Sequence, residues 1–216
     1  MKNNAKEDLY IRVDQIRKNL GISSYDNPID TLDLCMHKIC DVEIICHPFD
    51  TSGFCGAAFA GDKTSTIILN STRSNVEQNF DCGHELIHLV RHRHLNDGIF
   101  NCFKENRNSF LEWEANEGSA QFLVPYQDFI PRFTTLLNAN AVGIQSTLAE
   151  HYHVTVQVIN IRMSSLAYEI DQYQEGARLD CLELLSRRQR EQRGITSTCY
   201  QARCDFALDW DSAISF

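Results

Sequence analysis

The sequence predicts an α+β fold, in which a small mixed or antiparallel sheet packs on helices and a C-terminal helical subdomain follows. Short apolar segments separated by glycine turns precede residue 70, and longer segments with helical spacing of apolar residues follow residue 75. The pattern His84-Glu85-Leu86-Ile87-His88 falls inside the first long helix. We expect a core over residues 1–125, a helical pair spaced like a helix-turn-helix over 126–170, and a partly helical tail over 171–216.

The N-terminal half alternates helical and extended patterns. We predict helices over Asp8–Leu20 and from Pro28 to about Cys40, because proline is favoured in the first turn of a helix. Turn residues such as Gly53 and Gly61 separate three expected strands. These strands are predicted over residues 42–46, 55–60 and 65–69.

The motif helix is predicted to start at about Asn75, after a polar turn over 70–74, and to run for roughly twenty residues. Two histidines four apart on a helix project from one face, so His84 and His88 can bind one metal ion. Glu85 would lie beside the ion without ligating it and could move a proton from water to a leaving amine. This is the chemistry of a zinc hydrolase.

A catalytic zinc usually has three protein ligands, so a third ligand is expected downstream. A helix is predicted over residues 109–124, ended by Pro125, and it carries Glu112, Glu114 and Glu117. Glu114 is preferred, because it shares a face with Gly118, a small residue that would let this helix approach the motif helix closely. Glu112 is the alternative.

His94 is a rival third ligand, since it lies six residues after His88, as in the metzincin pattern of three histidines. That pattern has glycine midway, where the chain leaves the helix sharply, and Arg91 occupies this position here. His94 is therefore the less favoured candidate. His92 lies one turn past His88, and a supporting or surface role suits it better than direct ligation.

These residues resemble the ImmA/IrrE family of zinc-dependent metallopeptidases, which share zincin-type helices. The resemblance covers roughly residues 25–170. It is carried by Leu69-Asn70, by Asn79-Phe80 through His88, by Glu112-Trp-Glu114-Ala-Asn116, by Phe122-Leu-Val-Pro125, and by Leu148–Thr155 running into Ile161–Leu166. Two residues depart from it. Ile87 stands where the family usually has glycine, and Gly118 stands where the family tends to have phenylalanine or alanine.

The resemblance implies Zn²⁺ on His84, His88 and Glu114, with Glu85 as general base. It also implies a protein substrate, a helix-turn-helix transcriptional repressor that is cleaved at one site to derepress its genes. The alternative is a zinc-binding antirepressor that acts by binding its partner without turnover. The candidates for a donor that stabilises the oxyanion are Tyr126, Tyr152, His151 and His153, and the sequence does not favour any one of them. For the extended substrate backbone, they offer an edge strand over Gly56–Ala60 or Thr66–Asn70.

Composition excludes several classes of protein. With 216 residues and 43% hydrophobic content the chain can bury a good core, and its apolar runs are too short to span a bilayer. The N-terminus lacks a secretory apolar core, so a cytoplasmic location is expected. The net charge of −9 disfavours direct nucleic-acid binding through a broad basic surface, although Arg187–Arg193 forms a local basic patch. Val156, Val158, Ile159 and Ile161 are expected to be packing residues rather than DNA contacts.

The nine cysteines are scattered without paired Cys-x-x-Cys motifs, so free, mostly buried thiols are expected instead of disulfides. Residues 96–108 are predicted to form a loop between the two ligand helices. Further helices are predicted over residues 126–138 and 144–152, and a single loosely packed helix over 172–193. No structure is predicted for residues 194–216.

Overall fold

The structure is a computed structural model that describes residues 5–22, 25, 28–50, 53–95, 99–103 and 110–195. Its sheet has four strands in the order β1-β3-β2-β4. Strand β1 (Val42–His47) pairs parallel with β3 (Ser65–Asn70), and β2 (Phe54–Phe59) pairs antiparallel with both β3 and β4 (Ile99–Phe103). The predicted mixed sheet and α+β class are therefore confirmed, as are the first three strands.

Strand β4 lies in the segment that the sequence predicts to be a loop, so that prediction is wrong for Ile99–Phe103. It forms the edge of the sheet next to β2, and residues 96–98 and 104–108 of the expected loop lie outside the described residues. Both strands proposed to bind a substrate backbone are interior, since β2 lies between β3 and β4 and β3 lies between β1 and β2. Their backbone groups already pair on both sides, so that prediction was wrong.

The motif helix α3 (Asn75–Ile87) begins at a capping box, in which Ser74 and Glu77 satisfy each other's backbone groups. Just upstream, Asn70 Oδ1 accepts hydrogen bonds from the backbone N–H groups of Phe49 and Thr72, each at 3.1 Å, and so fixes the turn out of β3. The helix continues into a π-helical turn at His88–His92. Helix α2 (Thr31–His37) packs on both α3 and β1.

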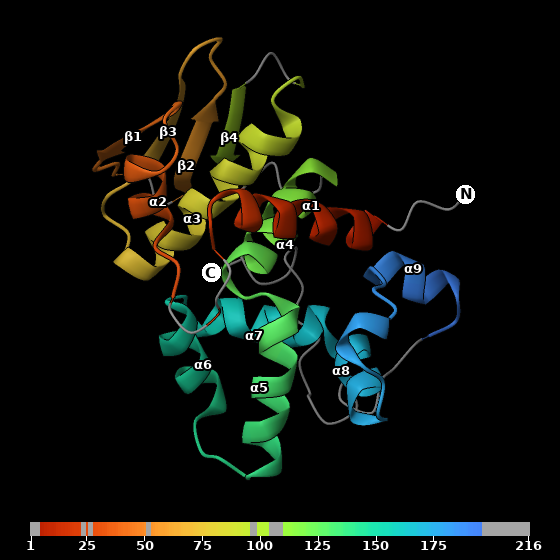
Figure 1. The fold of residues 1–216 in the computed structure, drawn as a ribbon. Helices are drawn as coiled ribbons and strands as arrows, with labels where there is room; N and C mark the ends of the chain where they lie inside the picture. The colour runs from red at the N-terminus through yellow and green to blue at the C-terminus, as the bar shows by residue number, and fades with distance from the viewer. Residues whose placement is uncertain are drawn as a thin grey trace.

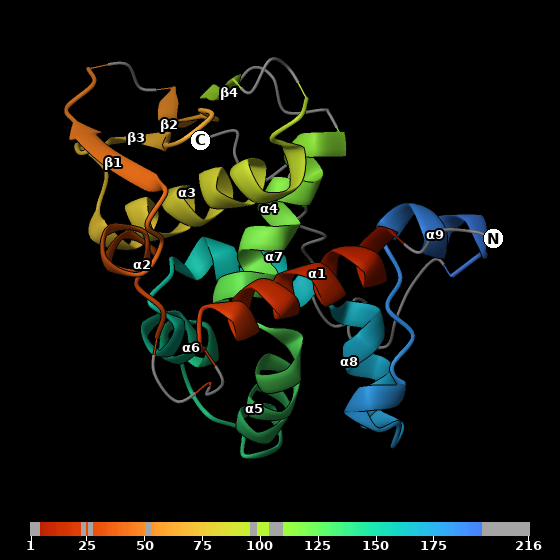
Figure 2. The ribbon, with the colours of Figure 1, turned by 45° about the horizontal axis from the view of Figure 1, so that its top comes forward.

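Helix α3 lies between the sheet and helix α4 (Phe110–Leu123), as Figures 1 and 2 show. On the far side of α4 runs the N-terminal helix α1 (Ala5–Asn19). The two ligand helices of the prediction are thus neighbours. Two glycines permit their close approach, because a Cβ on Gly83 would meet Ser119 Oγ at 2.6 Å and a Cβ on Gly118 would meet Ile87 Cγ2 at 3.1 Å.

The C-terminal helices lie together below the sheet and α3 in Figure 1. Helices α5 (Tyr126–Asn138) and α6 (Ile144–Tyr152) have the predicted bounds, and α7 (Val156–Ser165) and α8 (Ala167–Gln174) follow. The single helix predicted over 172–193 was wrong. Gly176 has a φ of +99°, which ends α8, and a short 3₁₀ turn (Leu179–Cys181) and helix α9 (Arg187–Gln192) come after it.

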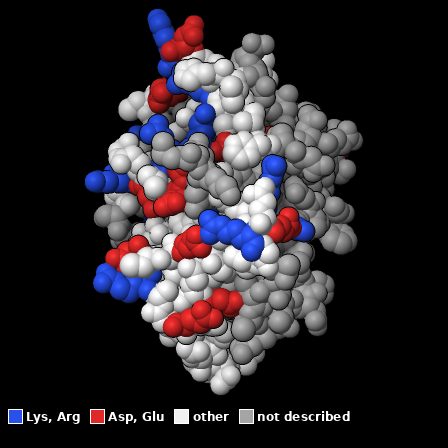
Figure 3. Space-filling model, turned by 90° about the vertical axis from the view of Figure 1, so that its right-hand side faces the viewer, with Lys and Arg blue, Asp and Glu red and all other residues white. Residues whose placement is uncertain are grey.

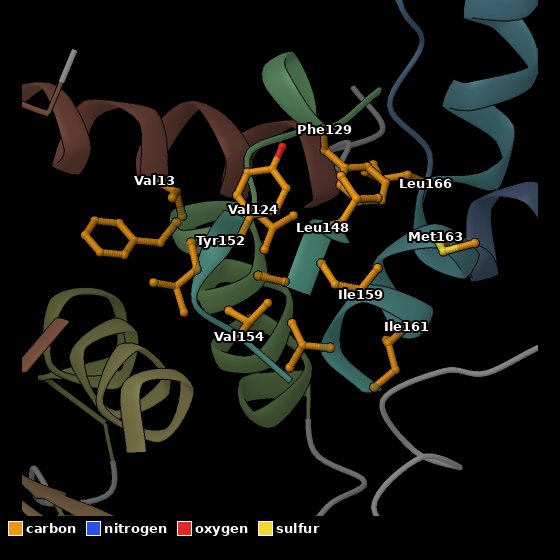
Figure 4. Close-up of a cluster of buried hydrophobic side chains, with 14 of the residues drawn as sticks. Val13, Val124, Phe129, Leu148, Tyr152, Val154, Ile159, Ile161, Met163 and Leu166 are labelled. Carbon is orange, nitrogen blue, oxygen red and sulfur yellow. The ribbon is translucent and has the colours of Figure 1, made fainter. Parts of the chain in front are cut away.

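One large hydrophobic cluster, drawn in part in Figure 4, joins side chains of α1, α4, α5, α6, α7 and α8. It runs across Pro125, the expected end of the first unit, so the division at residues 125 and 170 stays a prediction. A smaller cluster lies between α3 and the sheet and includes Ile67, Leu69 and Leu86. Of the four residues expected to pack in α7, Val158, Ile159 and Ile161 are buried, whereas Val156 is 42% exposed.

The helical core also holds buried charge. Arg162 of α7 is fully buried and donates to Glu117 of α4 at 2.8 Å, to the Tyr10 hydroxyl of α1 at 2.6 Å and to Val124 O at 2.9 Å. Lys6 of α1, which is 2% exposed, donates to Glu169 of α8 at 2.7 Å. Such pairs are stable in a dry core only when their hydrogen bonds are satisfied. They therefore fix how α1, α4, α7 and α8 are arranged.

On the face drawn in Figure 3, the described side chains form no broad basic patch, and acidic groups lie among the basic ones. Within the expected patch Arg187–Arg193, Arg187 pairs with Glu191 at 2.9 Å, Arg193 pairs with Glu183, and Arg190 is buried. Among the described helices, none has the length and apolar character needed to cross a bilayer. Among the described cysteines, Cys35, Cys55 and Cys82 are free and buried as expected, whereas Cys40, Cys46 and Cys181 are free but exposed, so the expectation of mostly buried thiols holds for only half of them.

Candidate metal centre

The two motif histidines lie together on the side of the motif helix that meets α4, with His84 in α3 and His88 at the start of the π-helical turn. Both are buried, His84 at 2% and His88 at 1% exposure, and their Nε2 atoms are 3.1 Å apart. Helix geometry brings them together, because residues four apart lie one above the other. The sequence prediction for this pair therefore agrees with the structure: both imidazoles point toward one spot.

Glu112, at the start of α4, completes the cluster. Its Oε2 lies 3.3 Å from His84 Nε2 and its Oε1 lies 3.3 Å from His88 Nε2. One ligand atom from each of the three residues falls within 4.8 Å of the other two, and no other group of three or more candidate ligands is found in the described part of the chain. Two imidazoles and one carboxylate are a donor set of catalytic zinc sites.

Glu114, the preferred third ligand from the sequence, points elsewhere. Its Oε2 lies 3.0 Å from His92 Nε2 and its Oε1 accepts from Arg91. Gly118 does lie at a close contact between the two helices, as predicted. Its neighbour there is the Ile87 side chain, and the contact does not turn Glu114 toward the histidines. The face of α4 that meets the histidines carries Glu112 and, one turn later, Asn116.

The other candidate, His94, is exposed, and the cluster does not include it. The π-helical turn after His88 ends α3 without the glycine that the metzincin pattern requires. Among the residues proposed for the oxyanion, Tyr152 donates its hydroxyl to Asp128 at 2.7 Å, and the Tyr126 ring stacks on Tyr10 at 5.6 Å. These contacts engage both tyrosines in the helical core.

Each candidate histidine ligand is held through its far nitrogen. Nδ1 of His84 is 2.9 Å from Asn116 Oδ1, and Nδ1 of His88 is 2.9 Å from His92 Nδ1. Phe100 of β4 stacks on the His88 ring at 4.8 Å with an interplanar angle of 12°. Sequence reasoning missed Asn116 and Phe100. Asn116 had a usable signal, since an amide four residues after Glu112 shares its helix face, but Phe100 lies on the unpredicted strand.

Glu85 is buried at 1% exposure, and neither of its carboxylate oxygens has a hydrogen-bond partner. It faces Gly56 of β2, where a Cβ would come within 3.3 Å of Glu85 Oε1. The register of β2 against β4 shifts between Phe54 and Gly56, so the strand pairing is irregular beside the site. A buried carboxylate without a hydrogen-bond partner destabilises the folded protein unless it binds a ligand or water. Glu85 is therefore positioned to act on a molecule bound at the cluster.

Burial and neighbouring charges set the protonation of the cluster. Burial raises the pKa of Glu85 to about 8. Burial lowers the pKa of His88 to about 4, whereas His84, despite its burial, has its pKa raised to about 9 by the hydrogen bond to Glu112 and the charge of Glu85. Although burial alone would raise it, the pKa of Glu112 is held well below its usual range by its close contacts with both histidines. Such a proton-sharing cluster can exchange its proton for a divalent cation.

The two departures from the resemblance touch each other. A Cβ on Gly118 would lie 3.1 to 3.4 Å from three side-chain carbons of Ile87. The space that a larger residue at position 118 would fill is thus taken by the isoleucine at position 87. The pair keeps the α3–α4 interface filled, and it leaves the three candidate ligands in place.

We expect the effect of Gly118→Ala to depend on Ile87. Overpacking a tight interface costs about 1–3 kcal/mol. Gly118→Ala should therefore lower the free energy of unfolding by that much more in the wild-type background than in the Ile87→Ala background. Urea unfolding of the wild type, both single variants and the double variant measures this coupling. Equal effects of Gly118→Ala in the two backgrounds would show that the contact does not constrain the interface.

A search of curated proteins gives no match for this chain. A family model described as the IrrE N-terminal-like domain, peptidase M78, matches residues 41–164, a span that includes the sheet, both motif histidines, Glu85 and Glu112. The matched segment is more than half of the chain. On this evidence the chain belongs to the IrrE N-terminal-like peptidase family.

Proposed function

We propose that this chain is a zinc-dependent endopeptidase in which His84, His88 and Glu112 hold the metal. The observation that carries the proposal is the buried cluster of these three side chains with an unpartnered Glu85 beside it. The distances support Glu112 over Glu114 as the third ligand. Two nitrogen donors and one carboxylate leave a fourth position free, as a catalytic zinc requires.

Glu85 is the proposed general base and acid. When bound, the zinc ion polarises the scissile carbonyl and lowers the pKa of the attacking water. The Glu85 carboxylate accepts a proton from that water and delivers it to the departing amine nitrogen. Burial favours the protonated form of Glu85, so the carboxyl group can hold the proton between these two steps near neutral pH.

The proposed substrate is a helix-turn-helix transcriptional repressor, cleaved at one site. Membership of a peptidase family supports a protein substrate, and the repressor follows from the sequence resemblance. The test is incubation of the zinc-loaded protein with purified repressors encoded beside its gene. We expect one new N-terminus by mass spectrometry, lost with 1,10-phenanthroline and restored by zinc. Zinc-loaded protein that leaves these repressors intact would contradict the proposed substrate.

Gly56 provides a test of how closely Glu85 must be placed. Gly56→Ala would bring a methyl group within 3.3 Å of the Glu85 carboxylate, so we expect the carboxylate to shift and peptidase activity to fall by up to about 10²-fold. Zinc affinity should be unchanged, because none of the three nearest contacts of that methyl group belongs to a proposed ligand.

The matched control for this prediction is Gly53→Ala, where an added Cβ meets nothing within 4 Å. The kcat of Gly56→Ala and Gly53→Ala on a common peptide substrate should therefore differ. A Gly56→Ala protein that is folded and as active as Gly53→Ala would mean that Glu85 does not need this space.

A further inference from the structure

Behind His88 lies a third buried histidine, His92, which the proposed chemistry does not use. His92 ends the π-helical turn and is 2% exposed. Its Nδ1 is 2.9 Å from His88 Nδ1, and its Nε2 is 3.0 Å from Glu114 Oε2. The other oxygen of Glu114 accepts from Arg91, which also contacts Asp8 of α1 at 3.3 Å. The order of contacts is therefore Glu114, His92, His88.

The positions of the protons in this series of contacts can be assigned by starting from Glu114. An ionised carboxylate only accepts hydrogen bonds, so Glu114, paired with Arg91, accepts a hydrogen bond from His92 Nε2–H. With that proton on Nε2, His92 offers the lone pair of its Nδ1 atom, which accepts from His88 Nδ1–H. With its proton on Nδ1, His88 has a lone pair on Nε2, the atom that faces His84 Nε2 and Glu112.

We propose that His92 and Glu114 are positioning residues that hold His88 in the tautomer and ring orientation required of a metal ligand. This inference rests on the proposed function, since it assigns His88 to the metal. Phe100 supports the same orientation by stacking on the face of the His88 ring. For His84, Asn116 Oδ1 supplies the acceptor at Nδ1 directly.

The arrangement explains why α4 carries two carboxylates so close in sequence. Glu112 faces the histidine Nε2 atoms, and Glu114 reaches the far side of the site through His92. An outer partner of this kind typically changes metal affinity by about 10- to 100-fold when it is removed. Glu114, which the sequence predicts as a metal ligand, thus acts on the site through the imidazole of His92.

The test compares variants that keep or lose each acceptor. His92→Asn can place an amide oxygen near the position of Nδ1, whereas His92→Leu has no acceptor. Likewise, Glu114→Gln keeps a carbonyl oxygen for His92, and Glu114→Ala does not. We expect zinc affinity, measured by chelator competition, to fall about 10- to 100-fold in His92→Leu and Glu114→Ala and to recover substantially in His92→Asn and Glu114→Gln.

The tautomers are measured directly in the wild-type protein by ¹⁵N-histidine NMR. We expect the zinc-loaded protein to carry the His92 proton on Nε2, which leaves His92 Nδ1 to accept from His88. A His92 proton on Nδ1, or wild-type zinc affinity in His92→Leu, would overturn the inference. Both measurements are independent of proteolysis. Zinc binding with this dependence but no peptide cleavage would therefore refute the proposed function and leave the positioning role intact.

Discussion

Glu85→Gln is expected to lower peptide-bond hydrolysis by about 10²–10⁴-fold, the usual contribution of a general acid–base group, while zinc stays bound. Glutamine has nearly the same shape as glutamate but cannot accept and return the proton. Glu85 is not in the candidate ligand cluster, and its oxygens have no hydrogen-bond partner that the substitution would break. Zinc content and thermal unfolding of the variant should therefore remain close to those of the wild type.

The same variant separates catalysis from binding. Cleavage of the repressor and release of its target genes are measured side by side in wild type and Glu85→Gln. If the endopeptidase proposal holds, both are lost together although the variant still binds zinc and its partner. Derepression that survives in Glu85→Gln would instead support the antirepressor, which acts by binding alone and needs no turnover.

Glu112→Ala is expected to weaken zinc binding by more than about 100-fold, the upper end of what loss of an outer partner costs. The substitution removes the carboxylate whose two oxygens each lie 3.3 Å from a histidine Nε2. Two imidazoles alone make an incomplete zinc site. Zinc stoichiometry after dialysis and affinity by chelator competition give the size of the loss, and peptidase activity should fall with it.

Two controls rank the alternatives for the third ligand. His94→Ala changes an exposed residue outside the cluster and should bind zinc as the wild type does. Glu114→Ala removes the contact to His92 and should weaken zinc less than Glu112→Ala does. If Glu114→Ala instead lost more zinc than Glu112→Ala, the assignment of the third ligand would have to be reversed in favour of the original sequence prediction.

The parts of the fold that were predicted correctly are those set by local sequence. The capping box at Ser74 and the apolar spacing of α3 act over a few residues, and the bounds of α5 and α6 follow from the same kind of pattern. One error has a non-local cause and the other a local cause that apolar spacing does not show. Strand β4 lacks a period of its own and exists through its pairing with β2, and the helix expected over 172–193 is interrupted at Gly176, whose positive φ no apolar spacing reveals.

The sequence by itself determined that His84 and His88 face one spot with Glu85 between them, because four residues make about one turn of a helix. Only the tertiary structure decided which carboxylate of α4 meets them. The rotation of α4 against α3 is set by how Ile87 packs on Gly118 and Ser119 on Gly83, contacts between residues more than thirty positions apart in the chain. That rotation turns Glu112 toward the histidine Nε2 atoms and Glu114 toward His92.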